Sequence, residues 1–143
     1  MNSLKDEDLV RTATHDWAKA IAEKNADKAA EFFADDVVSF ELAPPLKHIG
    51  LDRRLLNDWF ATWDGMINYD ITDQVVEVSD RLAISRSIDH MVGKRNDGQL
   101  VDIWTRSTVC FRKENDTWKV IHVHSSVPFY MDGSLKAAVD LKP

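Results

Sequence analysis

The most informative stretch of the chain is residues 118–128, Trp118-Lys119-Val120-Ile121-His122-Val123-His124-Ser125-Ser126-Val127-Pro128. Frequent Val and Ile, without an apolar stripe at helical spacing, predict a β-strand. Side chains alternate across a strand, so one face is predicted to hold Trp118, Val120, His122, His124 and Ser126. Two imidazoles and a hydroxyl in one row exceed what packing needs. They indicate a face that exchanges protons or binds a ligand.

Further strands precede this one and are separated from it by turn-forming residues. The turns are Ser79-Asp80, Asn96-Asp97-Gly98 and Glu114-Asn115-Asp116, and they divide the chain into strands predicted at 67–78, 82–94, 100–113 and 118–127. An earlier strand is predicted at 37–42. It should end before Pro44-Pro45, because proline cannot continue a central ladder.

The N-terminal part of the chain has helical periodicity. Ser3 is the candidate cap of a helix whose apolar face comprises Leu9, Val10, Ala13, Trp17, Ala20 and Ile21 and which ends near Asn25. Asp27 is predicted to open a second, shorter helix. Gly50 and Asp52 introduce a third, which carries Leu55, Leu56, Trp59, Phe60 and Trp63 and stops at Gly65.

Helices followed by a meander of strands predict an α+β fold. Three N-terminal helices would cover one face of a curved antiparallel sheet, and such long strands twist enough to form a cone-shaped barrel. The helices would fill part of its concave side and leave the remainder as a pocket.

Composition narrows the class of protein. We expect a single domain over residues 1–143, since that length encloses a core. A net charge of −6 argues against nucleic-acid and acidic-membrane partners. Cys110 is the one cysteine, which excludes an intramolecular disulfide and fits a reducing cytoplasm. The polar, acidic N-terminus does not resemble a signal peptide, and no apolar run is long enough to span a bilayer.

Strand pairing predicts which side chains meet. If residues 113–117 form the last hairpin loop, Thr108 pairs with His122 and Arg106 with His124. With an even hairpin at Asp97-Gly98, one face collects His90, Asp102, Trp104, Arg106, His122 and His124. A one-residue slip would split this group. Because unpaired buried charges are unfavourable, the group favours a ligand pocket, although an ion pair between Arg106 and Asp102 would also explain part of it.

The chain is similar to the nuclear transport factor 2-like (NTF2-like, cystatin-like) superfamily, in its SnoaL-like and ketosteroid-isomerase-like branch. The resemblance rests on the helix order, on Phe40-Glu41-Leu42-Ala43-Pro44-Pro45-Leu46, on Asp102-Ile103-Trp104-Thr105-Arg106-Ser107-Thr108 and on the closing strand. The His-x-His-x-Ser run also resembles the association domain of calcium/calmodulin-dependent protein kinase. These likenesses imply a pocket between sheet and helices and a homodimer formed through the convex sheet surface, where the odd-numbered apolar residues would lie.

The ketosteroid-isomerase likeness carries over only in part. That enzyme uses an Asp base and an oxyanion hole of a Tyr and a protonated Asp. Asp102 resembles the second Asp, and Glu41 is the carboxylate nearest to the position of the base. The tyrosine of the first helix has no counterpart; Trp17 is nearest, and an indole donates a hydrogen bond but is a poor acid. Steroid isomerisation is therefore not expected.

The first functional hypothesis is a pocket for a small carboxylate or enolisable carbonyl compound, with proton abstraction beside the carbonyl as an isomerase, cyclase or dehydratase would perform it. The predicted catalytic residues are His124 and His122, which exchange protons, and Asp102, which fixes a tautomer. Predicted ligand contacts are Arg106, Trp104, His90, Trp17, Trp63 and Glu41; the two helical tryptophans also fit core packing.

Two alternatives stay open. One is a non-catalytic ligand-binding or oligomerisation module, as the kinase-association likeness implies. The other is a metal site at His122 and His124 completed by His90 or Asp102, which the neighbouring Arg106 would disfavour. We expect no metal, because His-x-His spacing also occurs by chance in strands. We expect no cofactor; the sequence has no phosphate-cradling Gly-rich loop.

Overall fold

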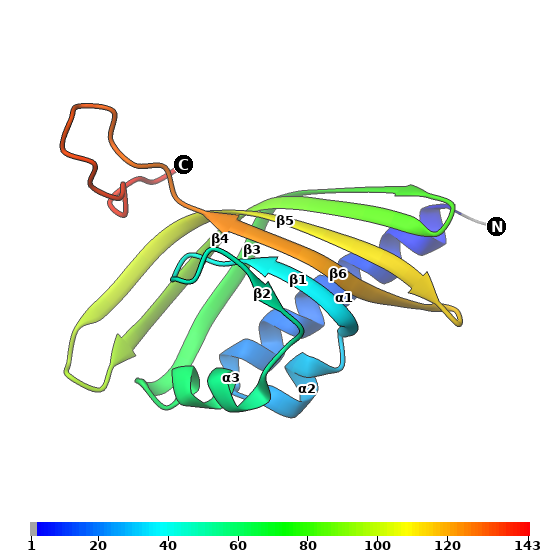
Figure 1. Ribbon diagram of the computed structural model, residues 1–143, viewed down its shortest axis with the longest axis horizontal. Helices are drawn as coiled ribbons and strands as arrows, with labels where there is room; N and C mark the ends of the chain where they lie inside the picture. Colours follow the sequence, from blue (N-terminus) through cyan, green and yellow to red (C-terminus); the bar gives the residue numbers. More distant parts are fainter. Residues whose placement is uncertain (1–2) are drawn as a thin grey trace.

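The computed structural model describes residues 3–143, which form a curved six-stranded sheet with three helices on its concave side (Figure 1). The helices are α1 (Ser3–Ala22), α2 (Ala26–Ala30) and α3 (Arg53–Phe60), and the strands are β1 (Phe33–Phe40), β2 (His48–Ile49), β3 (Trp63–Ser79), β4 (Leu82–Arg95), β5 (Leu100–Glu114) and β6 (Thr117–Ser126). The strand order is β2-β1-β6-β5-β4-β3, so the sheet stays open at β2 and β3. The predicted α+β class, with a curved sheet packed against three N-terminal helices, is confirmed.

The sheet is mixed, whereas a wholly antiparallel sheet was predicted. β1 runs parallel to β6, with Val38 opposite His122 and Phe40 opposite His124. The other neighbouring pairs are antiparallel. No hairpin joins β1 to β6, so no turn forces these strands into opposite directions. The sequence pattern therefore located β1 but not its direction.

Capping residues set where the short helices begin. The Asn25 side chain accepts a hydrogen bond from a backbone N–H of the first turn of α2, and Asp52 does the same for α3. The third helix ends at Phe60, earlier than predicted. The carbonyl of Thr62 accepts a hydrogen bond from the backbone N–H of Asn96 in the β4–β5 turn, and Trp63 is the first residue of β3. Trp63 is therefore a strand residue that packs in the core.

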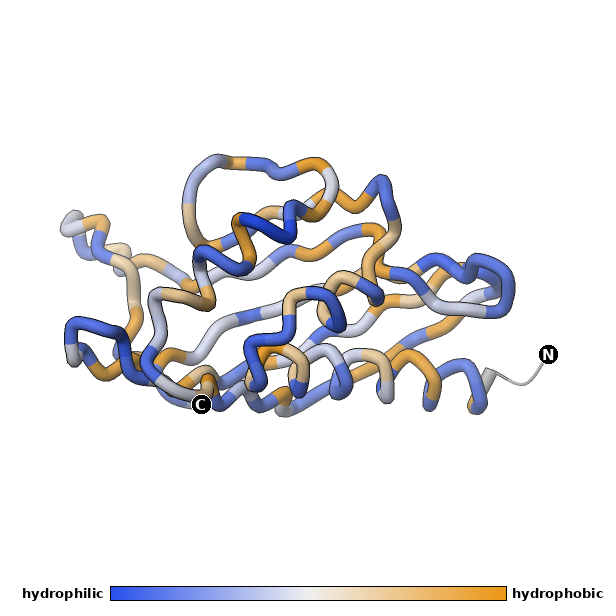
Figure 2. Tube along the Cα trace, turned by 90° about the horizontal axis from the view of Figure 1, so that it is seen from below, coloured by the Kyte–Doolittle hydropathy of each residue, from blue (hydrophilic) through white to orange (hydrophobic). Residues whose placement is uncertain are grey.

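Apolar residues of α1 pack on the sheet in two places. The first buried cluster contains Val10, Val37, Val76, Ala83, Phe111, Trp118 and Val120. The second contains Ala20, Ile21, Ala26, Ala29, Phe60, Trp63 and Ile67, with Trp17, Tyr69, Met91 and Val101 packed against it. Hydrophobic and hydrophilic residues alternate along α1 in Figure 2, as an amphipathic helix requires.

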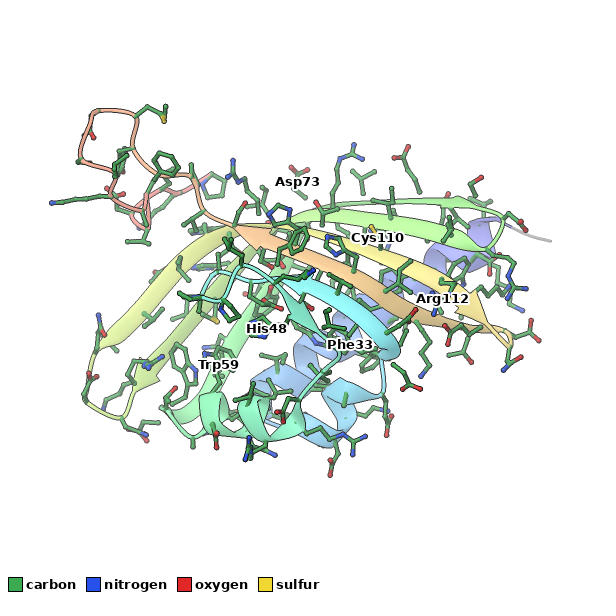
Figure 3. All side chains as sticks on the ribbon, viewed as in Figure 1. Phe33, His48, Trp59, Asp73, Cys110 and Arg112 are labelled. Carbon is green, nitrogen blue, oxygen red and sulfur yellow. The ribbon has the colours of Figure 1, made fainter. Side chains whose placement is uncertain are left out.

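A bulge in β3 locks α1 to the sheet. The pairing of β3 with β4 shifts between Thr72 and Val75, where Asp73 (labelled in Figure 3) has a φ of 50°. The side-chain amide of the next residue, Gln74, donates hydrogen bonds through Nε2 to the hydroxyls of Thr14 at 2.8 Å and of Ser85 at 2.9 Å. These bonds hold the helix over β3 and β4, next to the residues described below.

Candidate functional site on the helix-facing side of the sheet

The six predicted site residues on the long strands do share one face of the sheet. In the β4–β5 ladder His90 lies opposite Trp104, and in the β5–β6 ladder Thr108 lies opposite His124. The last ladder is displaced by two residues from the predicted register, since Cys110 rather than Thr108 faces His122. On this side of the bulge described below, a shift of two keeps each side chain on its own face, so the grouping of these six residues is confirmed. The prediction that Trp118 and Val120 share this face is wrong, because they pair with Lys113 and Phe111 and pack in the core.

That face, however, is turned away from the helices, and the prediction that it lines a pocket beneath them is wrong. We call it the outer face; on it lie Ile84, Arg86, Ile88, His90, Asp102, Trp104, Arg106, Thr108, Cys110, His122, His124 and Ser126. Their odd-numbered neighbours form the inner face, against α1: Ala83, Ser85, Ser87, Asp89, Met91, Thr105, Ser107, Val109 and Phe111.

Two physical facts explain the error. Alternation along a strand fixes which residues share a face, but not which face meets the helices. A bulge at Ile121, between the pairs Phe111–Val120 and Cys110–His122, then places Val120 on the inner face and His122 on the outer one. Val123, the apolar neighbour of both histidines, therefore faces the helices, whereas the prediction placed it on the convex surface.

Contacts within the outer face satisfy most of its polar groups. His90 Nε2 lies 2.6 Å from Asp102 Oδ1, and the His90 ring stacks on Trp104 at 4.0 Å. Arg106 Nε donates to Ser126 Oγ at 3.2 Å. This arrangement is a hydrogen-bonded surface network and not an enclosed catalytic constellation.

The two histidines of β6 are held in the same way. His122 Nδ1 lies 2.7 Å from the carbonyl oxygen of Val38, and both His122 and His124 contact the Phe40 ring edge-on. Within the described residues, no three His, Cys, Asp or Glu side chains converge as a possible metal site. The histidines are therefore packed against β1.

The remaining predicted residues lie on the helix side of the sheet. Trp17 of α1 contacts Tyr69 edge-on at 5.1 Å between ring centroids. Trp63 contacts Trp59 of α3, which is labelled in Figure 3, and its buried indole N–H has no hydrogen-bond partner among the described residues. Glu41 directly follows β1 and interacts electrostatically with Tyr69.

A buried tyrosine–carboxylate pair that was not predicted lies on the inner face. The Tyr69 hydroxyl of β3 donates to Asp89 Oδ2 of β4 at 2.6 Å. The Ser87 hydroxyl donates to the other carboxylate oxygen, Oδ1, also at 2.6 Å. Asp89 is only 3% exposed, so this carboxyl is held by two hydroxyl donors in a nearly dry environment.

Burial shifts the proton equilibria of this pair. It raises the pKa of Asp89, and the hydrogen bonds from Ser87 and Tyr69 oppose that rise. Burial likewise raises the pKa of Tyr69 well above its usual value, and the nearby charges of Asp89 and Glu41 add to the effect. Both groups therefore keep their protons to higher pH than in water.

Glu41 is the third ionisable group here. Its side chain is exposed, yet the surrounding protein withdraws enough water to raise the pKa of its carboxyl, and the charge of His48 partly offsets this. A carboxylate with a raised pKa is a better proton acceptor at neutral pH than an ordinary one. Tyr69, Asp89 and Glu41 thus bring three ionisable groups with raised pKa values to the inner face.

One signal in the sequence could have identified Asp89. Along the inner-face positions of β4 from Ala83 to Gly93, it is the one ionisable residue. A single carboxylate among small and apolar residues on a packed face is unfavourable unless it has a purpose. The tyrosine had no comparable signal, because its contact with Asp89 depends on how β3 pairs with β4.

A groove of about 340 Å³ lies elsewhere, between α1 and the β5–β6 turn. Its lining includes Leu9, Ala13, Phe32 and Trp118, but neither Tyr69 nor Asp89. The predicted pocket beneath the helices stays a prediction.

Comparison with known proteins places the chain in a family. Residues 10–130 match the SnoaL-like domain model, and the chain belongs to that family. No functionally curated protein matches it. An NTF2-like protein of unknown function from Pseudomonas putida KT2440 is similar, with 25% identity over 99% of each chain and a TM-score of 0.88.

Two further structures share the fold. A candidate scytalone dehydratase from Novosphingobium aromaticivorans has 15% identity over 94% of this chain and 92% of its own, with a TM-score of 0.77. A candidate calcium/calmodulin-dependent protein kinase II association domain from Xanthomonas campestris has 22% identity over 82% and 84%, with a TM-score of 0.68. The NTF2-like fold is thereby confirmed. No helix among residues 3–143 combines the length and apolar character that a membrane span needs.

Proposed function

We propose that this chain binds a small enolisable carbonyl compound on its inner face and moves a proton next to the carbonyl group. The observation that carries the proposal is the buried Tyr69–Asp89 pair, which lies within electrostatic reach of Glu41. Membership of the SnoaL-like family and the fold shared with a candidate dehydratase support this reaction class.

Each group has a defined part in the reaction. The Glu41 carboxylate takes the proton from the carbon beside the carbonyl, and the C–H electron pair forms the new C=C bond. The carbonyl π electrons move to oxygen, which accepts a hydrogen bond from the Tyr69 hydroxyl in place of the bond that this hydroxyl donates to Asp89 in the free protein. Return of the proton to another carbon gives an isomer; departure of a β-hydroxyl group as water gives a dehydrated product.

Deuterium exchange tests this step without knowledge of the natural substrate. The protein is incubated in D₂O with a panel of enolisable ketones and β-hydroxy ketones, and exchange at the α-carbon is followed by NMR. Glu41→Gln should slow exchange about 10²–10⁴-fold, as expected for loss of a general base. Tyr69→Phe should slow it about 10²–10³-fold, as expected for loss of an oxyanion donor.

His124→Gln, on the outer face, is the matched control and should leave exchange unchanged. If Glu41→Gln and Tyr69→Phe exchange as fast as the unaltered protein, the inner face is not where the chemistry occurs. If the unaltered protein exchanges none of the panel, the catalytic proposal is overturned and the inner face is at most a binding site.

We also propose that two copies pair through the outer face, which would make the chain a homodimer. Within the described residues, the helices cover the inner face only, and the outer face retains the aromatic Phe40 and Trp104. The fold shared with a candidate association domain favours an assembly role beside the ligand-binding one. The single cysteine, Cys110, fits the proposed cytoplasmic location.

A further inference from the structure

Residues after β6 form a separate arm that is held together by its own backbone. Phe129 bridges to Ala137, Tyr130 N donates to Lys136 O at 2.8 Å, and Ala138 N donates to Pro128 O at 2.8 Å. The Tyr130 hydroxyl also donates to Asp140. In Figure 1 this arm, drawn in orange to red, stands clear of the sheet on the side away from the helices. We call residues 128–141 the C-terminal arm.

The arm presents apolar side chains to solvent. Met131 is 89% exposed, Leu135 75% and Phe129 52%, and Val139 and Leu141 are also exposed. Leu135 has a φ of 58°, a left-handed conformation that is unfavourable for a leucine. An ordered segment that exposes this much apolar surface indicates an interaction site.

We propose that the C-terminal arm of one copy packs on the outer face of a second copy of this chain. The inference rests on the homodimer proposed above and adds the element that holds it together. Arm and outer face lie on the same side of the sheet, so a two-fold axis would seat each arm on the partner's sheet in a reciprocal contact.

Charge favours the second copy as the occupant. Each chain has a net charge of −6, so two copies repel unless opposite charges meet where they touch. The arm carries the carboxylates of Asp132 and Asp140 and one ammonium, that of Lys136. The outer face carries Arg106, whose hydrogen bond goes to a serine hydroxyl and which forms no ion pair within the described residues. The arm has one more carboxylate than ammonium, and on the outer face Arg86 and Arg106 outnumber the carboxylate of Asp102, so the two surfaces are complementary in charge.

Sedimentation equilibrium of the full chain tests the inference. Leu135→Asp should weaken dimerisation at least tenfold, because it places a charge in the apolar contact. Leu55→Asp, which changes an exposed leucine of α3 on the opposite side of the sheet, is the matched control and should dimerise like the unaltered chain. A chain that ends at Val127 should dimerise as weakly as Leu135→Asp, so that the conclusion does not depend on one variant alone.

Ile88→Asp on the outer face separates the two proposals. If Ile88→Asp disrupts the dimer but the Leu135→Asp and shortened chains do not, the outer-face dimer stands and the role of the arm is overturned. If the arm variants disrupt it and Ile88→Asp does not, the arm seats elsewhere and the inference is overturned. A full chain that is monomeric at micromolar concentration overturns both, while the deuterium-exchange proposal stays independent of this outcome.

Discussion

The inner and outer faces of the sheet differ most clearly within β5, where neighbouring residues meet opposite environments. Thr105, Ser107 and Phe111 are buried on the inner face, whereas Arg106 and Thr108 between them are exposed on the outer face. The outer face has more ionisable groups, but its polar side chains pair with one another or reach solvent. The inner face has few ionisable groups, and burial shifts their pKa values.

The difference shows that the number of reactive residue types on a face is a poor guide to function. His90 and Asp102 pair at the surface, where a partly exposed polar pair contributes little. Asp89 instead stays on a packed face although burial disfavours its charged form. An ionisable group kept on a packed face despite such a cost is the stronger indication of a site.

The largest expected effect on stability comes from a substitution that disrupts the packing of the inner face. Phe111 is 1% exposed and lies in the cluster around Val10, so Phe111→Ala should lower the free energy of unfolding by about 3–5 kcal/mol. Thr108→Ala, on the outer face of the same strand, should change it by less than about 0.5 kcal/mol. Urea denaturation measures both. Equal effects would mean that the two faces are not packed as described.

A second prediction concerns the one glycine whose missing side chain makes room for a tryptophan. A Cβ on Gly93 would lie 2.8 Å from Trp63 Cζ3, closer than packed atoms approach. Gly93→Ala should therefore destabilise the protein by about 1–3 kcal/mol through overpacking. Lys94→Ala on the opposite face should be nearly neutral, because Lys94 and its partner Asp64 are both exposed.

Tryptophan fluorescence and urea denaturation together check this prediction. Gly93→Ala should also change the emission spectrum, since the indole of Trp63 has to move. A variant with unchanged stability and spectrum would show that the Trp63 ring does not lie over β4.

The third prediction is a stability difference that depends on pH. Burial raises the pKa of Asp89, so its favourable contribution is complete below the pKa of the unfolded chain and is lost as pH rises through the folded value. Asp89→Asn carries no charge at any pH. The unaltered protein should therefore lose stability relative to Asp89→Asn as pH rises through that window, measured by thermal unfolding at a series of pH values.

Asp6 of α1 provides a control of opposite sign. Hydrogen bonds from Lys113 and Trp118 lower the pKa of this carboxyl, with the Lys113 bond as the largest cause. Its contribution is present above the unfolded pKa and is lost as pH falls through the folded value. Asp6→Asn should thus remove stability that the unaltered protein has at neutral pH. The same pH slope for both variants would contradict the two assignments.

Most of the fold was predictable because it depends on local patterns. The turns at Asp80, Asn96-Asp97-Gly98 and Asn115-Asp116 separate β3 to β6 as expected, and Asp52 caps α3. The direction of β1 was not predictable, because no hairpin joins it to β6. Nor was the end of α3, since Trp63 fits an apolar helical stripe as well as a strand.

The candidate site was less predictable than the fold. Alternation correctly grouped His90, Trp104 and Arg106, but two extra conditions decide which face they occupy. One is the bulge at Ile121, which reverses the alternation in the middle of β6. The other is the packing of α1, whose Val10 buries the face that carries Phe111, Trp118 and Val120. Neither condition can be predicted from the spacing of the histidines.

The smallest expected effect on stability comes from a substitution on the outer face, at Asp102. His90 and Asp102 form a close pair, but the Asp102 side chain is 55% exposed, so the pair should contribute less than about 1 kcal/mol. Asp102→Asn should therefore barely change the free energy of unfolding and leave deuterium exchange intact. Glu41→Gln should do the reverse, with little loss of stability and a large loss of exchange, because Glu41 is an exposed side chain and the proposed base. If Asp102→Asn abolishes exchange instead, the chemistry lies on the outer face, and the histidines there regain the catalytic role that their sequence pattern predicts.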